Sequence, residues 1–378
     1  MQNLADLPLI LALSGDPGGA NALAPVIDAL RKSGRVRVEA RAYRQACAVW
    51  QRRGLSFESV DEAVEPPIPP NTRLVLTSTS LNGVDLEKRV IVTAGLRGIP
   101  SVTVLDFWSN YRRRFSSTGD NLDRLPDKIA VMDAQAQKEM VEEGFDVERL
   151  VATGQPAFDD LTRWRAGFTP ERRATVRERF GVAPGDLLVI FASQPFLAFR
   201  SSGVELPQYP GYDEHSVAAL LVKALEQIAE ESQRGITLAI RLHPREEASS
   251  FDDLRSERIR VLVATGGDAF EAVCAADLVT GMSTVLLVEA CYLGCVVASL
   301  QPNLRGPDTL PTNRLGFSRA LYSEGEILPA MRELLLDAET RRQATEKLTH
   351  FRATGDAAQK VADLVCSLLQ PHLSPIHS

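Results

Sequence analysis

The sequence has little positive charge and few aromatic residues. Its 42 lysines and arginines are outnumbered by 49 aspartates and glutamates, and only 6% of its 378 residues are aromatic. The net charge of −7 provides no general basic surface, so we do not expect nucleic acid as the main partner. Two short basic runs remain, at 112–114 and 172–173, and we interpret the second as a solvated face.

The five cysteines are few and form no Cys-x-x-Cys pair. Most of them lie in apolar segments, which suits small core residues. The sequence therefore indicates neither a disulfide framework nor a zinc site, and we expect no metal and no cofactor.

Long hydrophobic runs are also missing. No uninterrupted apolar run approaches the length that spans a membrane. Residues 1–13 lack a basic n-region and lead directly into a glycine loop, so we interpret them as a first strand rather than a signal peptide. With 44% hydrophobic and 24% charged residues, the chain is expected to be a cytoplasmic globular protein of two domains.

Strand-like and helix-like segments alternate along the whole chain, which is typical of parallel α/β sheets with helices on both faces. The segment 156–180 is charged and helical, and interruptions at Gly167 and Pro170 indicate a connection between domains. We predict strands at 7–13, 35–41, 73–77, 101–106, 128–131, 150–153, 187–192, 237–242, 260–263 and 278–280. We predict helices at 22–31, 46–53, 134–143, 217–231, 326–336, 339–351 and 356–369.

Residues 277–300 are predicted to form a strand, a tight turn, a helix and a second strand. Gly281 would permit the turn, and Ser283 or Thr284 stands where a helix N-cap belongs. Free N–H groups and the helix dipole favour a phosphate there, while Glu289, more than one turn into the helix, could accept a hydrogen bond from a ribose diol. The candidate nucleotide site comprises Gly281, Met282, Ser283, Thr284 and Glu289. An ordinary buried crossover helix remains an alternative.

A glycine-rich loop, Ser14 to Asn21, lies between the first predicted strand and the next helix. Gly15, Gly18 and Gly19 would allow a ligand to approach the backbone closely. The loop matches neither GxGxxG nor a Walker P-loop, so a nicotinamide or ATP site is disfavoured. Asp16 is a candidate general base at the carboxyl edge of the first strand, or alternatively a turn aspartate ahead of Pro17.

Residues 241–245 end another predicted strand. His243, Arg241 and Arg245 would offer a donor and fixed cations to a diphosphate, because Pro244 stops the strand there. Gln194 begins a long loop, 194–213, which we expect at a sheet's carboxyl edge and in contact with substrate.

A loop at 106–112 combines an acid, aromatic residues and an arginine. Asp106 is a second candidate base, and Trp108 and Arg112 would suit a sugar-like acceptor. Gly154 follows a later strand and is a candidate for ligand contact through its backbone.

Several of these motifs together resemble the GT-B superfamily, which includes nucleotide-sugar glycosyltransferases, non-hydrolysing UDP-N-acetylglucosamine 2-epimerases and CDP-glycerol transferases. The resemblance covers almost the whole chain and is carried by the order and spacing of its motifs. The matching segments are 15–19 with 23–26, 151–156 with 158–159, His243-Pro244, Ser283-Thr284 with Glu289-Ala290 and Gly294, and 355–358.

The resemblance implies two Rossmann-like, doubly wound α/β domains facing a cleft. Residues 1–165 would form the acceptor domain, residues 166–352 the donor domain, and residues 353–378 a helix packing back on the first domain. The implied function is metal-independent glycosyl transfer from a nucleotide sugar to a carbohydrate or other hydroxyl acceptor, in surface polysaccharide or glycoconjugate biosynthesis. A UDP, CDP or CMP donor is favoured, and no retaining-type Glu-x7-Glu helix is present in 280–300, which favours inversion.

Two alternatives stay open. The first is an epimerase or hydrolase acting on a UDP-N-acetylhexosamine. The epimerases carry an arginine and a glutamate in the first loop and a Ser-Gly-Gly stretch with paired glutamates later, and this chain has Pro17-Gly18-Gly19 and Met282-Ser283-Thr284 instead. The second is a non-catalytic nucleotide-sugar-binding protein. The oligomeric state and the choice of base, sugar and acceptor are left undetermined by the sequence.

Overall fold

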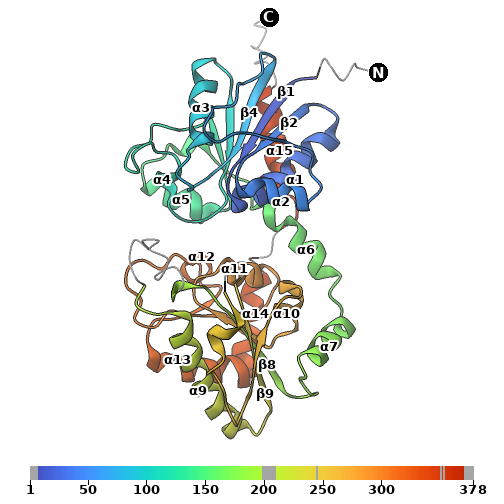
Figure 1. Ribbon diagram of the computed structural model, residues 1–378, viewed down its shortest axis with the longest axis vertical. Helices are drawn as coiled ribbons and strands as arrows, with labels where there is room; N and C mark the ends of the chain where they lie inside the picture. The colour runs from blue at the N-terminus through green and yellow to red at the C-terminus, as the bar shows by residue number, and fades with distance from the viewer. Residues whose placement is uncertain (1–6, 198–209, 244–245, 350, 352–353, 370–378) are drawn as a thin grey trace, which may run out of the picture. The chain divides into compact units, whose positions relative to one another are not determined.

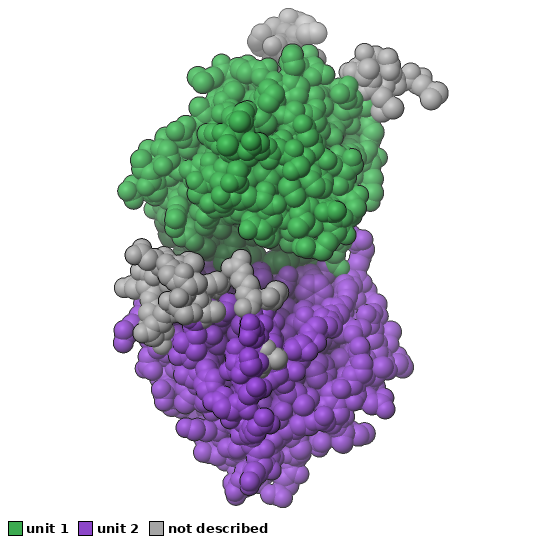
Figure 2. Space-filling view, in the orientation of Figure 1, with its two compact units in different colours: residues 1–160, 353–378 green, residues 161–352 purple. Residues whose placement is uncertain are grey.

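The computed structural model describes residues 7–197, 210–243, 246–349, 351 and 354–369, and it divides into two compact units (Figure 1). Unit 1 comprises residues 1–160 and 353–378, and unit 2 comprises residues 161–352 (Figure 2). The sequence placed this boundary at 165. The structure places it earlier because Trp164 stacks on Phe168 and packs edge-on against Phe270, which ties most of helix α6 (Asp159–Ala166) to unit 2.

Unit 1 is built on a seven-stranded sheet of parallel strands in the order β3-β2-β1-β4-β5-β6-β7. The order reverses its direction between β1 and β4, which makes this pair the topological switch point of the sheet. The strands are β1 (Leu9–Ser14), β2 (Arg37–Ala42), β3 (Glu58–Ser59), β4 (Thr72–Ser78), β5 (Ser101–Val104), β6 (Lys128–Val131) and β7 (Leu150–Ala152).

Helices cover both faces of this sheet, as the alternation of side chains along β1 requires. Ile10 and Ala12 join the core formed with α1 (Pro17–Ser33), α2 (Gln45–Arg52) and α15 (Ala357–Leu369). Leu11 and Leu13 join a separate core with α3 (Leu86–Leu96). The short helix α4 (Tyr111–Arg114) and helix α5 (Ala134–Glu142) complete the unit.

The C-terminal helix α15 lies beside α1 in unit 1 (Figure 1). Its first turn is held by Asp159, whose two carboxylate oxygens accept hydrogen bonds from the N–H groups of Ala357 (3.1 Å) and Ala358 (2.8 Å). These bonds satisfy backbone donors that a helix leaves unpaired at its start. The last helix of the chain therefore completes the first unit.

Unit 2 contains a six-stranded sheet of parallel strands in the order β10-β9-β8-β11-β12-β13. Its switch point lies between β8 and β11. The strands are β8 (Leu187–Ala192), β9 (Ile236–Arg241), β10 (Arg260–Ala264), β11 (Leu278–Gly281), β12 (Val297–Leu300) and β13 (Arg319–Leu321).

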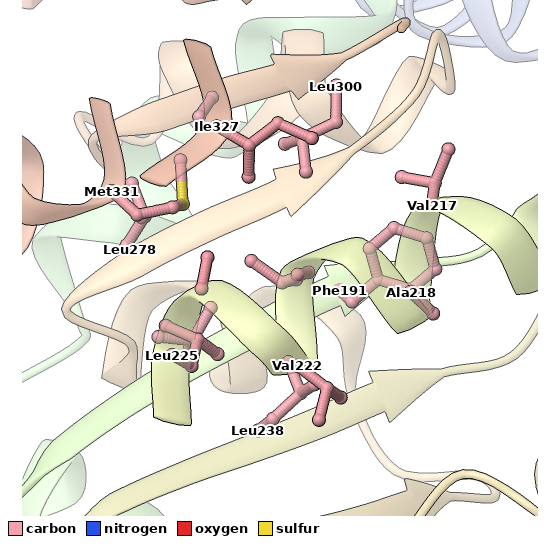
Figure 3. Close-up of a cluster of buried hydrophobic side chains, with 14 of the residues drawn as sticks. Phe191, Val217, Ala218, Val222, Leu225, Leu238, Leu278, Leu300, Ile327 and Met331 are labelled. Atoms are coloured by element: carbon pink, nitrogen blue, oxygen red, sulfur yellow. The ribbon is translucent and has the colours of Figure 1, made fainter. Parts of the chain in front are cut away.

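Helices α9 (Glu214–Ser232) and α13 (Glu324–Leu336) pack against each other and against the strands of unit 2. Figure 3 shows this core, in which Phe191 and Leu278 from the sheet meet Val217 and Met331 from the two helices. The remaining helices of unit 2 are α7 (Pro170–Arg179), α10 (Ala269–Ala275), α11 (Val285–Tyr292), α12 (Pro311–Arg314) and α14 (Ala338–Thr349).

The predicted α/β class and the alternation of strands and helices are confirmed. Within the described part of the chain, no helix combines the length and the apolar character needed to cross a lipid bilayer.

Candidate functional site

Each unit carries a polar cluster at the switch point of its sheet. In unit 1, Asp16 follows β1 and the segment 79–82 follows β4. In unit 2, Gln194 follows β8 and the segment 282–284 follows β11. Because open α/β sheets bind ligands outside the carboxyl ends of their strands at this point, these two clusters are the candidate functional sites.

Asp16 reaches across the switch point of unit 1. Its Oδ2 accepts a hydrogen bond from the N–H of Leu81 (2.7 Å), and its Oδ1 accepts one from Nδ2 of Asn82 (2.7 Å). Asp16 stands at the N-cap position of α1 but makes no side-chain capping bond to that helix. Its half-buried carboxylate is therefore directed at the loop after β4.

A buried glutamate lies behind Asp16 and was missed by the sequence analysis. Glu87 Oε2 accepts a hydrogen bond from the hydroxyl of Tyr43 (2.6 Å), and its Oε1 accepts one from the hydroxyl of Ser80 (2.5 Å). Burial raises the pKa of Glu87 to about 7, and burial together with the charge of Glu87 raises the pKa of Tyr43. The sequence feature that could have identified Glu87 is a charged residue on the apolar face of α3, close to Leu86 and Val90.

Asp106 is held differently from Asp16. Its Oδ1 accepts a hydrogen bond from the hydroxyl of Thr79 (2.5 Å) and forms an ion pair with the guanidinium group of Arg114. Only 11% of the Asp106 side chain and 6% of the Arg114 side chain are exposed. The side-chain amide of Gln155 also donates to the Asp106 carbonyl (2.7 Å). Asp106 is thus part of a nearly buried ion pair.

The glycine-rich loop packs against these same side chains. A methyl group added at Gly15 would overlap the ring of Tyr43, and one added at Gly18 would overlap the Asp106 carboxylate. A Cβ at Gly19 would lie 2.5 Å from Oγ of Ser78. Neighbouring protein atoms therefore leave no room for a Cβ at these three positions, while Gly18 itself is exposed.

Left-handed backbone at non-glycine residues is concentrated near this edge of unit 1. Arg44, Asp85 and Asn110 have φ angles of 49°, 57° and 56°, and they follow β2, β4 and β5. Such conformations cost free energy and cluster at functional sites. Their position agrees with a functional role for the edge that carries Asp16.

Trp108 and Arg112 do not line the site, contrary to the prediction. Trp108 is buried, and its Nε1 donates to Oδ2 of Asp133 (2.7 Å). The guanidinium group of Arg112 donates to the carbonyl oxygens of Asp120 (2.7 Å) and Glu143. Both side chains hold the loop after β5 against α5.

Gly154 is likewise explained by packing. Its φ is +94°, and a Cβ there would lie 2.8 Å from Cβ of Ala357. The residue therefore allows the start of α15 to approach the sheet, and no ligand contact is needed to account for it.

In unit 2, the turn before α11 has the predicted polar character. The N–H of Ser283 donates to Oε1 of Gln194 (2.8 Å). Thr284 is the N-cap, and its hydroxyl accepts from the N–H of Leu286 (3.4 Å), which settles the choice left open between Ser283 and Thr284. The N–H groups of Thr284 and Val285 have no hydrogen-bond partner among the described residues.

Gly281 and Met282 have structural roles that differ from the predicted ones. Gly281 is the last residue of β11, and a Cβ there would lie 2.8 Å from the carbonyl oxygen of Ala192 on β8. Close strand packing and not a sharp turn requires this glycine. The Met282 side chain is buried in the core of unit 2, and its carbonyl accepts a 2.5 Å hydrogen bond from Ser299.

The carboxylate of Glu289 has no hydrogen-bond or ion-pair partner within the described ranges. The residue is half-buried on α11, and burial raises its pKa to about 7. A carboxylate removed from water without a partner is costly, which a hydroxyl-bearing ligand would offset.

The neighbouring cluster at the end of β9 combines predicted and missed residues. Glu246, which the sequence analysis missed, accepts from the backbone N–H of His243 (2.6 Å) and from the hydroxyl of Ser193 (2.6 Å). Arg241 donates to the carbonyl oxygens of Gly266 (3.1 Å) and Gly267 (3.0 Å), and burial lowers its pKa. Arg241 thus holds the loop before α10, and the predicted Pro244 and Arg245 lie outside the described residues.

No group of three or more histidine, cysteine, aspartate or glutamate side chains in the described ranges is arranged to hold a metal ion.

Comparisons with known proteins define the fold. No family model matches the sequence, and no curated protein matches it. Solved structures with a similar fold include UDP-N-acetylglucosamine 2-epimerases and glycosyltransferases. The predicted GT-B fold is confirmed at this level.

Three solved structures illustrate the likeness. The UDP-GlcNAc 2-epimerase of Neisseria meningitidis, solved with UDP-GlcNAc, is 12% identical, with a TM-score of 0.63 over 95% of this chain and 100% of that chain. MnaA of S. aureus, solved with UDP, is 13% identical, with a TM-score of 0.66 over 96% and 97%. MurG of Acinetobacter baumannii is 12% identical, with a TM-score of 0.60 over 95% and 99%. At these identities the likeness concerns the fold.

Proposed function

We propose that the protein is a metal-independent glycosyltransferase that moves a sugar from a nucleotide-sugar donor to a hydroxyl group of a carbohydrate or glycoconjugate. The observation that carries this proposal lies at the turn between β11 and α11. The N–H groups of Thr284 and Val285 and the carboxylate of Glu289 have no partner among the described residues. Such an activity would serve the synthesis of a surface polysaccharide or glycoconjugate in the cytoplasm.

Unit 2 would bind the donor. The N–H groups of Thr284 and Val285 and the positive end of the α11 dipole would stabilise the leaving diphosphate. Glu289 would accept hydrogen bonds from the ribose hydroxyls. His243, at the carboxyl end of β9, would add a donor to the phosphates. A UDP donor fits the UDP-GlcNAc and UDP of two solved structures with a similar fold, and CDP and CMP are the alternatives.

Unit 1 would activate the acceptor. Asp16 accepts its two hydrogen bonds from neutral groups, whereas Asp106 is paired with Arg114. We therefore assign the role of general base to Asp16. It would take the acceptor proton as the new bond to the anomeric carbon forms and the bond to the diphosphate breaks.

A second candidate is epimerisation or hydrolysis of a UDP-N-acetylhexosamine. The fold fits this activity equally well, because the solved structures similar to this chain include UDP-N-acetylglucosamine 2-epimerases. Such an enzyme would consume the nucleotide sugar without an acceptor, whereas a transferase would release free nucleotide only slowly until the acceptor is added.

The first experiment is thermal stabilisation of the full-length protein by UDP, GDP, dTDP, CDP, CMP and NAD, each with and without EDTA. A ligand that binds the folded state raises the unfolding midpoint by mass action. We expect a selective shift with one nucleotide that EDTA does not change and that Glu289→Ala weakens. The absence of a shift with every nucleotide, or a shift with NAD alone, would remove the proposal.

A matched pair of variants then separates binding from chemistry. Asp16→Asn should lower turnover while the thermal shift given by the donor nucleotide stays unchanged. Glu289→Ala should raise the donor KM and weaken the thermal shift, while turnover at saturating donor stays unchanged. Equal turnover in wild-type protein and Asp16→Asn would show that another group removes the acceptor proton.

A further inference from the structure

A chain of hydrogen bonds leads from the half-buried carboxylate of Asp16 to the buried carboxylate of Glu87. Asn82 Nδ2 lies 2.7 Å from Oδ1 of Asp16 and 3.2 Å from the hydroxyl oxygen of Tyr43. The Tyr43 hydroxyl in turn donates to Glu87 (2.6 Å). These four side chains, called the relay below, come from three loops and one helix of unit 1.

From Asn82 to Glu87, the donor and the acceptor of each hydrogen bond in the relay are fixed. The amide oxygen of Asn82 accepts from the N–H of Val84 (3.0 Å), which fixes the amide so that Nδ2 faces Asp16 and Tyr43. Nδ2 can only donate, so the Tyr43 oxygen must accept from it. The Tyr43 proton is then available only to Glu87, which has to accept it.

Packing keeps the relay in place. Tyr43 is buried, and its ring fills the space that a side chain at Gly15 would need. Gly15 directly precedes Asp16, so the ring of Tyr43 supports the backbone that carries the carboxylate. A movement of Tyr43 would therefore move Asp16.

Charged neighbours do not neutralise Glu87. Tyr43 faces it from the end of β2 and Ser80 from the end of β4, and the charge of Asp16 acts on it from the loop after β1. The next residue on the helix, Lys88, donates to the carbonyls of Arg113 and Ser116 and pairs with Asp85. Arg44 pairs with Glu62 and donates to the Asn82 carbonyl (2.8 Å).

A buried carboxylate without a cation is costly, and replacing it by an apolar residue would usually stabilise a fold. We propose that Glu87 is a positioning residue for Asp16, which acts through Tyr43 and Asn82 to orient the carboxylate that accepts the acceptor proton. This inference rests on the proposed role of Asp16 as the general base. Glu87 itself does not touch the substrate.

The titration of Glu87 would act on the geometry of the relay near neutral pH. Burial raises the pKa of Glu87 to about 7, so this group changes its charge in a range where an exposed glutamate stays ionised. When Glu87 gains a proton, a negative charge next to the relay is lost and Tyr43 is held less strongly. The orientation of Asp16 should follow this titration.

The kinetic test uses Glu87→Gln and Tyr43→Phe in the full-length protein. Gln keeps the shape of the side chain, and Phe keeps the ring beside Gly15. We expect kcat to fall about 10- to 100-fold in both variants, since small misplacements of a catalytic group have effects of this size, while the donor KM stays unchanged. In the wild type, kcat should fall as the pH drops through about 7, and this step should be missing in Glu87→Gln.

Thr77→Val is the matched control. It removes a buried hydroxyl bonded to the hydroxyl of Thr103 (2.8 Å) in the same sheet, outside the relay. We expect it to lower the unfolding midpoint without changing kcat or the pH profile. Unchanged kcat and an unchanged pH step in Glu87→Gln would overturn the inference.

A second measurement needs no substrate and so distinguishes failure of the inference from failure of the proposed function. The Leu81 N–H donates to Asp16, so its proton chemical shift in an NMR titration reports the geometry of this hydrogen bond. We expect a step with a midpoint near 7 in the wild type, set by Glu87, that disappears in Glu87→Gln. The same step in both proteins would refute the relay even if glycosyl transfer were established.

Discussion

Gln194 and Ser283 are joined by a hydrogen bond of 2.8 Å, in which the backbone N–H of Ser283 donates to the side-chain oxygen of Gln194. They follow the neighbouring strands β8 and β11, at the switch point of the second sheet. The bond fixes the turn that precedes α11. This turn carries the N–H groups of Thr284 and Val285, which have no partner in the described part of the chain.

Replacing Gln194 should weaken donor binding. Gln194→Ala removes the acceptor of the Ser283 N–H, and one hydrogen bond of this kind contributes about 1 kcal/mol. We expect the nucleotide affinity to fall about fivefold, since a factor of ten would need a loss of about 1.4 kcal/mol. Isothermal titration with the nucleotide identified by thermal shift measures this change.

Thr280→Val provides the comparison for Gln194→Ala. It removes a buried hydroxyl that donates to the Ile190 carbonyl (2.9 Å) on the same pair of strands, away from the turn. Its affinity for the nucleotide should equal that of the wild type. If both variants lose affinity equally, the Gln194 bond has only a general structural effect.

Trp108→Phe should leave substrate kinetics unchanged and lower stability. The indole N–H donates to Asp133, which also caps α5 by accepting from the N–H of Ala136 (2.8 Å). Loss of the indole bond should lower the free energy of unfolding by about 1 kcal/mol. Urea denaturation measures this loss, and a raised acceptor KM would instead restore Trp108 as an acceptor-binding residue.

The strands were the most predictable part of the fold from sequence. Residues 128–131 and 187–192 were predicted with the bounds of β6 and β8, because strands buried on both faces have nearly continuous apolar sequences. Helix α3 was missed. It begins after Asp85, which has a left-handed backbone and makes no side-chain capping bond, so the usual signal of a helix start is absent.

The candidate site was predictable in position but not in detail. Ends of strands identify Asp16, Gln194 and Thr284 because the carboxyl edge of a parallel sheet is where such residues meet. The direction of a side chain depends on tertiary packing. Trp108 and Glu87 therefore could not be assigned from the sequence, since one is directed into the core and the other approaches Tyr43 from a distant segment.

Asp106→Asn should act mainly on stability. The change leaves the guanidinium group of Arg114 nearly buried without its charged partner, and breaking a buried pair in this way costs about 3 kcal/mol or more. Chemical denaturation should show this loss, while kcat of the remaining folded enzyme should stay within the range of the wild type. A fall in kcat comparable to that of Asp16→Asn would mean that Asp106 is the base.

The double variant Asp106→Asn/Arg114→Gln tests the origin of that loss. Removing both charges avoids an uncompensated buried cation, so the double variant should be more stable than Asp106→Asn alone. Additive losses would contradict the ion-pair explanation.

Glu289 should make stability depend on pH. Its pKa is about 7 in the folded protein and 4.5 for an ordinary glutamate, so between these values the folded state holds a proton that the unfolded chain has released. The stability contributed by this group is therefore complete below pH 4.5 and is lost as the pH rises through 7. Glu289→Gln should match the wild type in acid and exceed it by up to about 3 kcal/mol above pH 7.

The same substitution should have the opposite effect on the bound state. A ribose diol donates to an ionised carboxylate better than to a neutral one, so nucleotide affinity in the wild type should fall as the pH drops through about 7. Glu289→Gln should bind more weakly at every pH and lose this dependence. Glu178→Gln, at an exposed glutamate of α7, changes the net charge equally and should alter neither property. Equal pH dependence of nucleotide affinity in the wild type and in Glu289→Gln would show that Glu289 does not contact the nucleotide.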